Sequence, residues 1–243
     1  MDLVHHLWLL TRDDQLCNSP KKDGAKRVLD IGTGTGIWVL AQGFGLWTTR
    51  TIILTQLVPP NCTFEVDDVE KEWTWTQPFD FIFIRSMIGS FSSWENIIAK
   101  AYQNLEPGGY IELQDSVFPL KCQDGTMTDD FKPYKWTKLL IEATEITGRP
   151  ITVAPSLKKM LEDAGFVDVV EKREIWPFTP WAKDQKHKDL GFWTQESAFM
   201  GIEAVSMALF TRVLGWSQAE ASVFCAEVRN EHKNSNVRAY YDV

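Results

Sequence analysis

A short apolar segment near the start of the chain runs directly into three closely spaced glycines. The residues Val28–Ile31 include strand-forming side chains, and glycines then occupy positions 32, 34 and 36. Glycine tolerates positive φ angles and lets a ligand approach the backbone N–H groups at the start of a helix. The pattern therefore predicts a ligand-binding turn made by Gly32, Thr33, Gly34 and Gly36.

The spacing of these glycines and the acid before them narrow the choice of ligand. A dinucleotide fingerprint has the form G-x-G-x-x-G and needs glycine at position 37, which is Ile37 here. Asp30, at the end of the apolar segment, would repel a pyrophosphate but suits a cation. S-adenosylmethionine carries an ammonium and a sulfonium group and no phosphate, so it fits this loop. The alternative is a tight glycine turn beside a solvated aspartate.

Methyl transfer from a sulfonium is an in-line displacement with a good, neutral leaving group. The protein must above all align the acceptor with the methyl carbon, and a general base is needed only where the acceptor loses a proton. Candidates for contact with the substrate are His5, His6, Glu112 and Gln114. Alternatively, the histidines lie on a partly exposed helix face and Glu112 bonds to neighbouring backbone. No metal site is predicted, because no His/Asp/Glu cluster has ligand spacing.

These residues need a scaffold, and strand and helix patterns alternate from residue 26 to residue 115. Strands are predicted over 26–31, 51–55, 62–66, 79–85 and 110–114. The fourth of these is almost entirely apolar, as in a strand buried on both faces of a parallel sheet. A helix is predicted over 37–44, and a second one after a capping box of Ser92 with Glu95. The second helix is expected to bury Trp94, Ile97, Ile98, Ala101, Tyr102 and Leu105. We expect an α/β fold with a doubly wound, Rossmann-like parallel sheet.

The second half of the chain is more helical. Helices are predicted over 134–148, 156–165 and 192–215, and a capping box of Ser217 with Glu220 opens the last one. The first of them is expected to bury Trp136, Leu139, Leu140, Ala143 and Ile146. A strand is predicted over 166–172, a loop over 176–181 and a short strand at the chain end. We expect one domain over 1–243, with a cofactor-binding core at 26–115 and a part at 116–243 that completes the sheet and forms a helical cap.

Composition argues against several classes of protein. The chain has 243 residues, of which 44% are hydrophobic and 24% are charged, as in a globular domain. A formal charge of −8 without any Lys/Arg-rich run argues against direct binding of nucleic acid. The four cysteines are widely separated, which favours neither a zinc site nor a redox motif. No apolar run or leader suggests a membrane or secretion, so we expect the cytoplasm or the nucleus.

Several segments together resemble the fungal LaeA-like methyltransferases, a class I group that depends on S-adenosylmethionine. They are VLDIGTGTGIW, FEVDD, FDFIFIR, LEPGGYIELQD and ALFTRVLGW, joined by the N-terminal MDLVHHLWLLT and the late WPFTPWAKDQKHKDLG. The similarity covers nearly the whole chain and is far more specific than the glycines alone. It implies that Asp30 and the Gly32–Gly36 loop face the methionine part of the cofactor.

Further roles follow from the same resemblance. Asp67 or Asp68 would reach the adenine amino group, with Val69 beside the ring, and Arg85 and Ser86 would line the cleft at the carboxyl edge of the sheet. Without the family context, the two aspartates could form a solvated turn, and Arg85 could simply end a strand at the surface.

The residue after the second predicted strand departs from the family pattern. Related enzymes have an acid there that accepts from both ribose hydroxyls, whereas this chain has Gln56 and a shorter loop. An amide accepts from one hydroxyl and donates to the other, but it lacks the charge assistance of a carboxylate. The expected loss is about 1–2 kcal/mol of cofactor binding.

Three hypotheses of function follow. The first is methylation of a small-molecule acceptor on oxygen or nitrogen in fungal secondary metabolism. Eleven tryptophans supply either core packing or an aromatic pocket for such an acceptor. The second is a LaeA-like regulator that acts through velvet-type protein partners. The lack of a long polar N-terminal extension makes this second hypothesis the less favoured one. The third is a degenerate homologue that no longer methylates.

Overall fold

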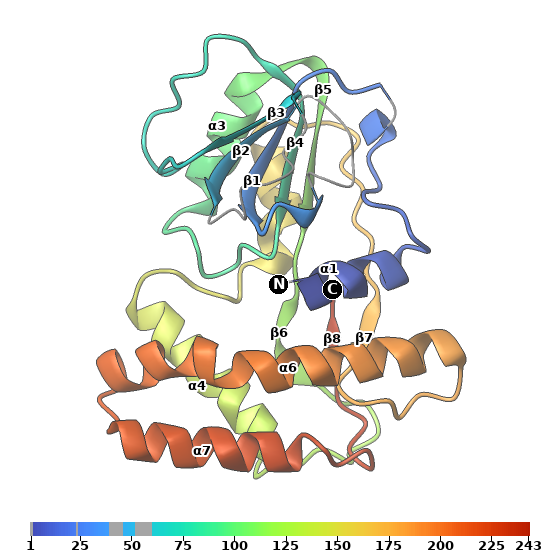
Figure 1. Cartoon of the computed structure of the whole chain (residues 1–243), viewed down its shortest axis with the longest axis vertical. Helices are drawn as coiled ribbons and strands as arrows, with labels where there is room; N and C mark the ends of the chain where they lie inside the picture. Colours follow the sequence, from blue (N-terminus) through green and yellow to red (C-terminus); the bar gives the residue numbers. More distant parts are fainter. Residues whose placement is uncertain (1, 23, 39–45, 52–59) are drawn as a thin grey trace. The chain divides into compact units, whose positions relative to one another are not determined.

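The computed structural model describes residues 2–22, 24–38, 46–51 and 60–243. The chain divides into two compact units, which are described separately. The first unit comprises residues 1–115 and 156–171, and the second comprises residues 116–155 and 172–243. Each unit contains its own sheet and helices (Figure 1). The expected cofactor-binding core, 26–115, lies entirely within the first unit.

A five-stranded sheet in the order β3-β2-β1-β4-β5 forms the first unit, and all its strands run parallel. Its strands are β1 (Val28–Gly34), β2 (Leu46–Thr51), β3 (Cys62–Glu65), β4 (Phe79–Arg85) and β5 (Leu105–Gln114). The strand order reverses between β1 and β4, and open α/β sheets bind ligands at the carboxyl edge of such a switch point. The predicted doubly wound sheet is confirmed. β2 begins earlier than the predicted strand at 51–55, of which positions 52–55 lie outside the described residues.

The centre of this sheet is buried as its sequence predicts. Every residue of β4 except Arg85 is buried. Trp38, at the start of the helix that follows the glycines, stacks on Phe83 with 4.0 Å between ring centroids. Burying a phenylalanine stabilises a fold by about 1.5–3 kcal/mol, so β4 and its neighbours anchor the edge on which the site is built. The helix predicted over 37–44 begins at Ile37, and its residues from 39 onward lie outside the described part.

The helices of the first unit are α1 (Asp2–Thr11), α3 (Trp94–Asn104) and α5 (Leu157–Asp163), with a short 3-10 turn at Pro20–Lys22. The predicted capping box of α3 is wrong by one residue. Ser93 caps the helix by accepting from Asn96 N, whereas Ser92 donates to Glu70 on a neighbouring loop. Tyr102 is 47% exposed rather than buried, and it packs edge-on against Phe166 beyond α5.

The second unit has a three-stranded antiparallel sheet in the order β6-β8-β7. Its elements are β6 (Val117–Lys121), α4 (Lys132–Ile146), a 3-10 turn at Ala154–Ser156, β7 (Ile175–Pro177), α6 (Gln185–Arg212), α7 (Gln218–Glu231) and β8 (Tyr240–Asp242). Among the described strands, these three pair only with one another, so the expected completion of the first sheet by the second half is not found. The three long helices contact one another, and Trp136 Nε1 on α4 donates to Ser206 Oγ on α6 at 2.7 Å.

Other predictions for the second half have mixed outcomes. The strand predicted over 166–172 is wrong, because Val167 and Val170 are exposed and unpaired in the sheets that the structure describes. Strand β7 forms later and takes up the first two residues of the predicted loop at 176–181. Ile146 is 62% exposed rather than buried. The capping box of Ser217 with Glu220 is confirmed, as is the short final strand.

Candidate active site at the carboxyl edge of the sheet

The three glycines form the turn at the end of β1. Gly32, Gly34 and Gly36 have φ angles of 80°, 58° and 79°, which other residues rarely adopt. Gly36 N donates to Thr33 O at 2.9 Å, and a helix starts at the next residue. A methyl group on Gly32 would overlap the sulfur of Met87, so that flexible side chain would have to shift. The turn therefore presents backbone N–H groups at a helix start, as the sequence predicts.

Asp30 lies just before this turn and is only 3% exposed. Its Oδ2 atom has no hydrogen-bond partner in the described part of the chain. Burial raises the pKa of Asp30 to about 6, while Thr33 and the charge of Arg85 act in the opposite direction. A buried carboxylate oxygen without a partner is costly unless a cation pairs with it. The ammonium group of S-adenosylmethionine supplies such a cation, so these residues fit that cofactor.

The N-terminal helix α1 reaches the same edge of the sheet. Thr35 Oγ1 donates to Asp2 Oδ1 at 2.8 Å, and Arg85 Nη2 donates to His5 Nδ1 at 2.9 Å. Burial and then the charge of Arg85 lower the pKa of His5 to about 4, so its ring is neutral and carries its proton on Nε2. Burial lowers the pKa of Arg85 to about 10, which leaves it charged at neutral pH. Two residues predicted for different roles thus contact each other.

The ends of β4 and β5 meet beside this contact. Ser86 has a φ angle of 56°, unusual for a residue with a side chain, and its N–H donates to Gln114 O at 2.9 Å. Asp115 Oδ2 accepts from Met87 N at 2.7 Å and from Ile88 N at 2.9 Å. Neither Met87 nor Asp115 is among the residues predicted for the site. The sequence signal for Asp115 is its position directly after the predicted strand 110–114.

Glu112, another candidate for substrate contact, makes several hydrogen bonds within the protein. Its carboxylate accepts from the backbone of Asn18 and Ser19 and from the side chain of Gln114. Arg12 Nη1 also lies 3.7 Å from Oε1. Glu112 therefore bonds to backbone, as in the alternative to substrate contact, and this backbone belongs to a segment far away in the sequence.

The remaining predicted site residues lie apart from these contacts. Asp67 and Asp68 are exposed beyond the end of β3, and their carboxylates accept from Asp68 N at 2.8 Å and Glu70 N at 3.1 Å, as in the solvated turn expected as the alternative. Val69 is 8% exposed, and its carbonyl accepts from Trp73 Nε1 at 2.9 Å. His6 is partly buried on α1. Gln56 lies outside the described residues.

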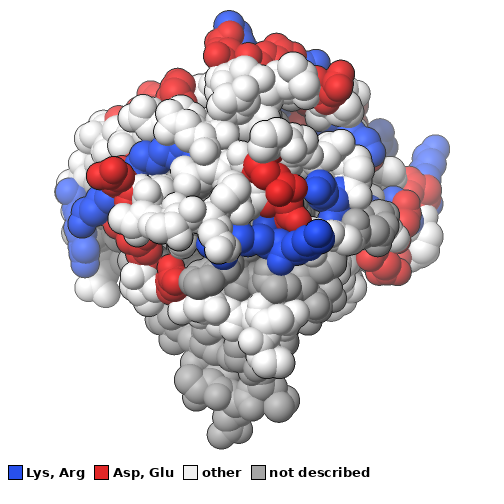
Figure 2. Space-filling view, turned by 90° about the horizontal axis from the view of Figure 1, so that it is seen from above, with Lys and Arg blue, Asp and Glu red and all other residues white. Residues whose placement is uncertain are grey.

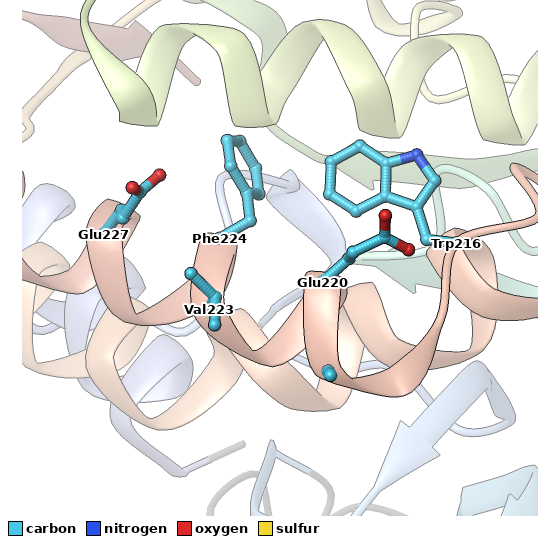
Figure 3. Close-up of a pocket in the computed structure, with 6 residues that line it drawn as sticks. Trp216, Glu220, Val223, Phe224 and Glu227 are labelled. Carbon is cyan, nitrogen blue, oxygen red and sulfur yellow. The ribbon is translucent and has the colours of Figure 1, made fainter.

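A hollow lies on the surface of the second unit. Its lining comes from residues on and just before α7: Trp216, Ala219, Glu220, Val223, Phe224 and Glu227 (Figure 3). Glu220 accepts from the cap residue Ser217, and Glu227 accepts from Lys132 Nζ at 2.6 Å. Both carboxylates are already paired, so this hollow offers apolar contact and no group suited to methyl transfer. Trp176, expected in a pocket or a core, is buried in the core.

On the face shown in Figure 2, basic and acidic side chains lie interspersed. The whole formal charge of −8 belongs to the first unit, because acidic and basic residues are equal in number in the second. No group of three or more metal-ligating side chains occurs in the described part of the chain. Nor does any helix described there have the length and apolarity to cross a membrane.

Comparison with known proteins agrees with this geometry. A family model for a methyltransferase domain matches residues 5–171. The methyltransferase pytC of Aspergillus terreus is 38% identical over 100% of this chain and 77% of its own length. The secondary metabolism regulator LAE1 of Cochliobolus heterostrophus is 33% identical over 100% of this chain and 83% of its own length. The solved structure of the cyclase SpnF has a TM-score of 0.50 at 17% identity, over 90% of this chain and 74% of that one, which shows a shared fold alone. The chain therefore belongs to the methyltransferase family, as an S-adenosylmethionine-dependent enzyme of the LaeA-like group with a class I fold.

Proposed function

We propose that this enzyme methylates an oxygen or nitrogen atom of a small molecule in fungal secondary metabolism. The observation that carries the proposal is the buried Asp30 carboxylate, which has an oxygen free for a cation at the mouth of a glycine turn. The similarity to pytC, a methyltransferase by name, supports the reaction. The similarity to a regulator of secondary metabolism supports the biological setting.

In this proposal, different residues of the first unit bind different parts of the cofactor. Asp30 holds the cofactor's ammonium group, and the backbone N–H groups of the turn at Gly32, Gly34 and Gly36 face its methionine part. Gln56 takes the ribose, Asp67 or Asp68 takes the adenine amino group, and Val69 lies near the ring. The cofactor supplies an electrophilic methyl group, and the enzyme aligns an acceptor atom with it.

The hydrogen bond between His5 and Arg85 limits the use of His5 as a base that takes a proton from the acceptor. His5 Nδ1 accepts from Arg85, so His5 can take a proton at that atom only after the contact breaks. An acceptor that keeps its nucleophilic lone pair without losing a proton first, such as an amine, needs no base. The surplus of acidic residues in the first unit favours an uncharged or cationic small molecule over nucleic acid. We place the enzyme in the cytoplasm or the nucleus.

Calorimetric titration of the full chain with S-adenosylhomocysteine tests the cofactor site. We expect micromolar binding in the parent protein and at least tenfold weaker binding in Asp30→Asn, because the amide cannot neutralise the ammonium group. Incubation with S-adenosylmethionine and extracts of fungal metabolites should then give a product heavier by one methyl group. Absence of binding at millimolar ligand would instead support a degenerate homologue.

A second candidate function is regulation through a protein partner. The similarity to LAE1 over the full length of this chain favours it, because that relative is a regulator by name. A pull-down with velvet-type proteins separates the two candidates. A stable complex together with no methylated small molecule would favour the regulator, whereas a methylated product without a complex would favour the enzyme.

A further inference from the structure

Glu112 lies on β5, yet its carboxylate bonds mainly to the N-terminal segment. Asn18 N lies 2.9 Å from Oε1 and 2.8 Å from Oε2, and Ser19 N donates to Oε2 at 2.7 Å. Gln114 Nε2 donates to Oε1 at 2.5 Å, and the Arg12 guanidinium lies nearby. The Glu112 side chain is only 11% exposed, so water screens these charge-assisted bonds little. Glu112 therefore ties residues 12–19 to the central sheet.

The segment that Glu112 holds follows directly on α1. That helix contacts the glycine turn through Asp2 and Thr35, and the end of β4 through His5 and Arg85. Its buried residues are His5, Leu7, Trp8 and Thr11. Both polar contacts lie at the carboxyl edge of the sheet, beside the place proposed for the methionine part of the cofactor. Helix α1 therefore covers that part of the site.

A turn at Asp13 and Asp14 lies between α1 and the backbone groups that Glu112 binds at Asn18 and Ser19, whereas Arg12 precedes this turn. Asp13 and Asp14 have φ angles of 51° and 65°, in the left-handed region that side chains disfavour. Such conformations persist where the surrounding structure enforces them. Backbone hydrogen bonds also hold the turn, from Asp14 N to Leu9 O at 2.9 Å and from Gln15 N to Arg12 O at 3.1 Å. The turn therefore links α1 firmly to the segment that Glu112 binds, and loss of Glu112 would free that segment and α1 together.

We propose that Glu112 is a positioning residue that holds α1 closed over the bound cofactor and so limits how fast the cofactor leaves. The inference rests on the proposed placement of the cofactor beside Asp30. Glu112 acts through α1 and needs no contact with the substrate. The cofactor enters or leaves when α1 moves away from the glycine turn, and the bonds of Glu112 determine how often that happens.

The test compares hydrogen exchange of α1 with the rate at which S-adenosylhomocysteine dissociates. Glu112→Ala removes every bond, whereas Glu112→Gln keeps a carbonyl acceptor and should rescue part of the effect. Glu106→Gln is the matched control: it removes an acid from the same strand whose ion pair with Lys21, at 3.4 Å, is more exposed. Exchange in β4, residues 79–85, reports whether the sheet stays folded.

We expect exchange at residues 2–11 and dissociation of S-adenosylhomocysteine each to become about tenfold faster in Glu112→Ala and about threefold faster in Glu112→Gln. Both rates should stay at the parent value in Glu106→Gln. If Glu112→Ala fails to fold, the inference is tested by the threefold change in the two rates that we expect in Glu112→Gln.

Two results would overturn the inference while leaving the proposed function intact. One is unchanged exchange of α1 in the Glu112 variants. The other is faster exchange of α1 with unchanged dissociation of the ligand. Absence of ligand binding by the parent protein would overturn the proposed function and the gating role together, and the parent titration identifies that case before any variant is made.

Discussion

Arg85 on β4 donates a hydrogen bond to Nδ1 of His5 on α1 at 2.9 Å, across 80 positions of the chain. The contact places a charged guanidinium at the sheet edge where Asp30 lies buried. Burial raises the pKa of Asp30 to about 6 against the opposing effects of Thr33 and Arg85, and burial followed by the charge of Arg85 lowers the pKa of His5 to about 4. At neutral pH the imidazole is therefore uncharged, and Asp30 and Arg85 determine the local charge.

Cofactor affinity should depend on pH through Asp30. The pKa of Asp30 is about 6, and only its ionised form pairs with the cofactor's ammonium group. We therefore expect affinity for S-adenosylhomocysteine to fall by up to tenfold per pH unit below about pH 6 and to level off above it. Calorimetry between pH 4.5 and 8 measures the profile. Arg85→Gln should move the midpoint to higher pH, whereas Arg85→Lys keeps the charge and should leave it near 6. A flat profile would contradict the role of Asp30.

Asp30→Asn should stabilise the protein without cofactor. The folded pKa of about 6 exceeds the ordinary value of 3.8, so the cost of the buried charge is absent below about pH 4, grows as pH rises through 6 and is constant above. Removing the charge should therefore add up to about 3 kcal/mol to the free energy of unfolding at pH 7.5. Urea denaturation at several pH values measures it.

Asp80→Asn is the matched control for that experiment. Asp80 is also buried, at 4% exposure, but its two oxygens accept from Lys26 N and Arg27 N at 2.6 and 3.1 Å. An amide leaves one of those donors without an acceptor, so we expect a loss of about 1–3 kcal/mol. Opposite signs for the two variants would separate a site acid from a structural one. A loss of stability in both would show that Asp30 is structural.

The sheet and the glycine turn were predictable because their signals are local. An apolar run such as Phe79–Arg85 can bury its side chains in few ways other than as a central strand. Three alternating glycines before a helix indicate a turn. The α3 cap was harder, because Ser92 and Ser93 are adjacent and chemically equal. Ser93 caps the helix while Glu70, 22 positions earlier, accepts from Ser92.

Contacts between distant segments could not be predicted in the same way. The spacing of residues gives no sign that Glu112 bonds to Asn18 and Ser19, since any half-buried acid on a strand has the same local pattern. The strand predicted over 166–172 was wrong for a related reason. Its valines form a pattern typical of a strand, but Val167 and Val170 are exposed, and β7 forms at Ile175–Pro177, where β8 is available for pairing.

Gly32→Ala should impair both folding and cofactor binding. The φ angle of 80° disfavours a side chain, and the added methyl group would overlap the Met87 sulfur. We expect a loss of about 2 kcal/mol or more in the free energy of unfolding. Gly24→Ala separates the two causes, because Gly24 has a φ angle of 85° and no atom within 4 Å of the added carbon. Equal losses in both variants would mean that the overlap with Met87 contributes nothing.

Gln56→Asp should tighten cofactor binding. A carboxylate accepts from both ribose hydroxyls with charge assistance, whereas the amide accepts from only one. We expect S-adenosylhomocysteine to bind about 5–30-fold more tightly, measured by calorimetry at pH 7.5. Gln56→Asn keeps an amide of the same length as the aspartate and should not reproduce the gain. Unchanged affinity in Gln56→Asp would show that this position does not contact the ribose.

His232→Leu should stabilise the second unit and reduce its sensitivity to acid. His232 is fully buried and stacks on Phe178 with 3.6 Å between ring centroids, and neither ring nitrogen has a hydrogen-bond partner among the described residues. Burial lowers its pKa to about 4, below the ordinary 6.5. Unfolding exposes the ring to protons, so stability should be constant above about pH 6.5 and fall by up to about 3 kcal/mol as the pH drops to 4.

A leucine of similar volume removes the unpaired N–H group at the expense of the ring stacking. We expect a gain of about 1 kcal/mol at pH 7.5 and a larger gain at pH 4.5, measured by urea denaturation. An equal gain at both pH values would show that His232 is not the group that makes the second unit sensitive to acid, since only a titrating ring makes the benefit of its removal depend on pH.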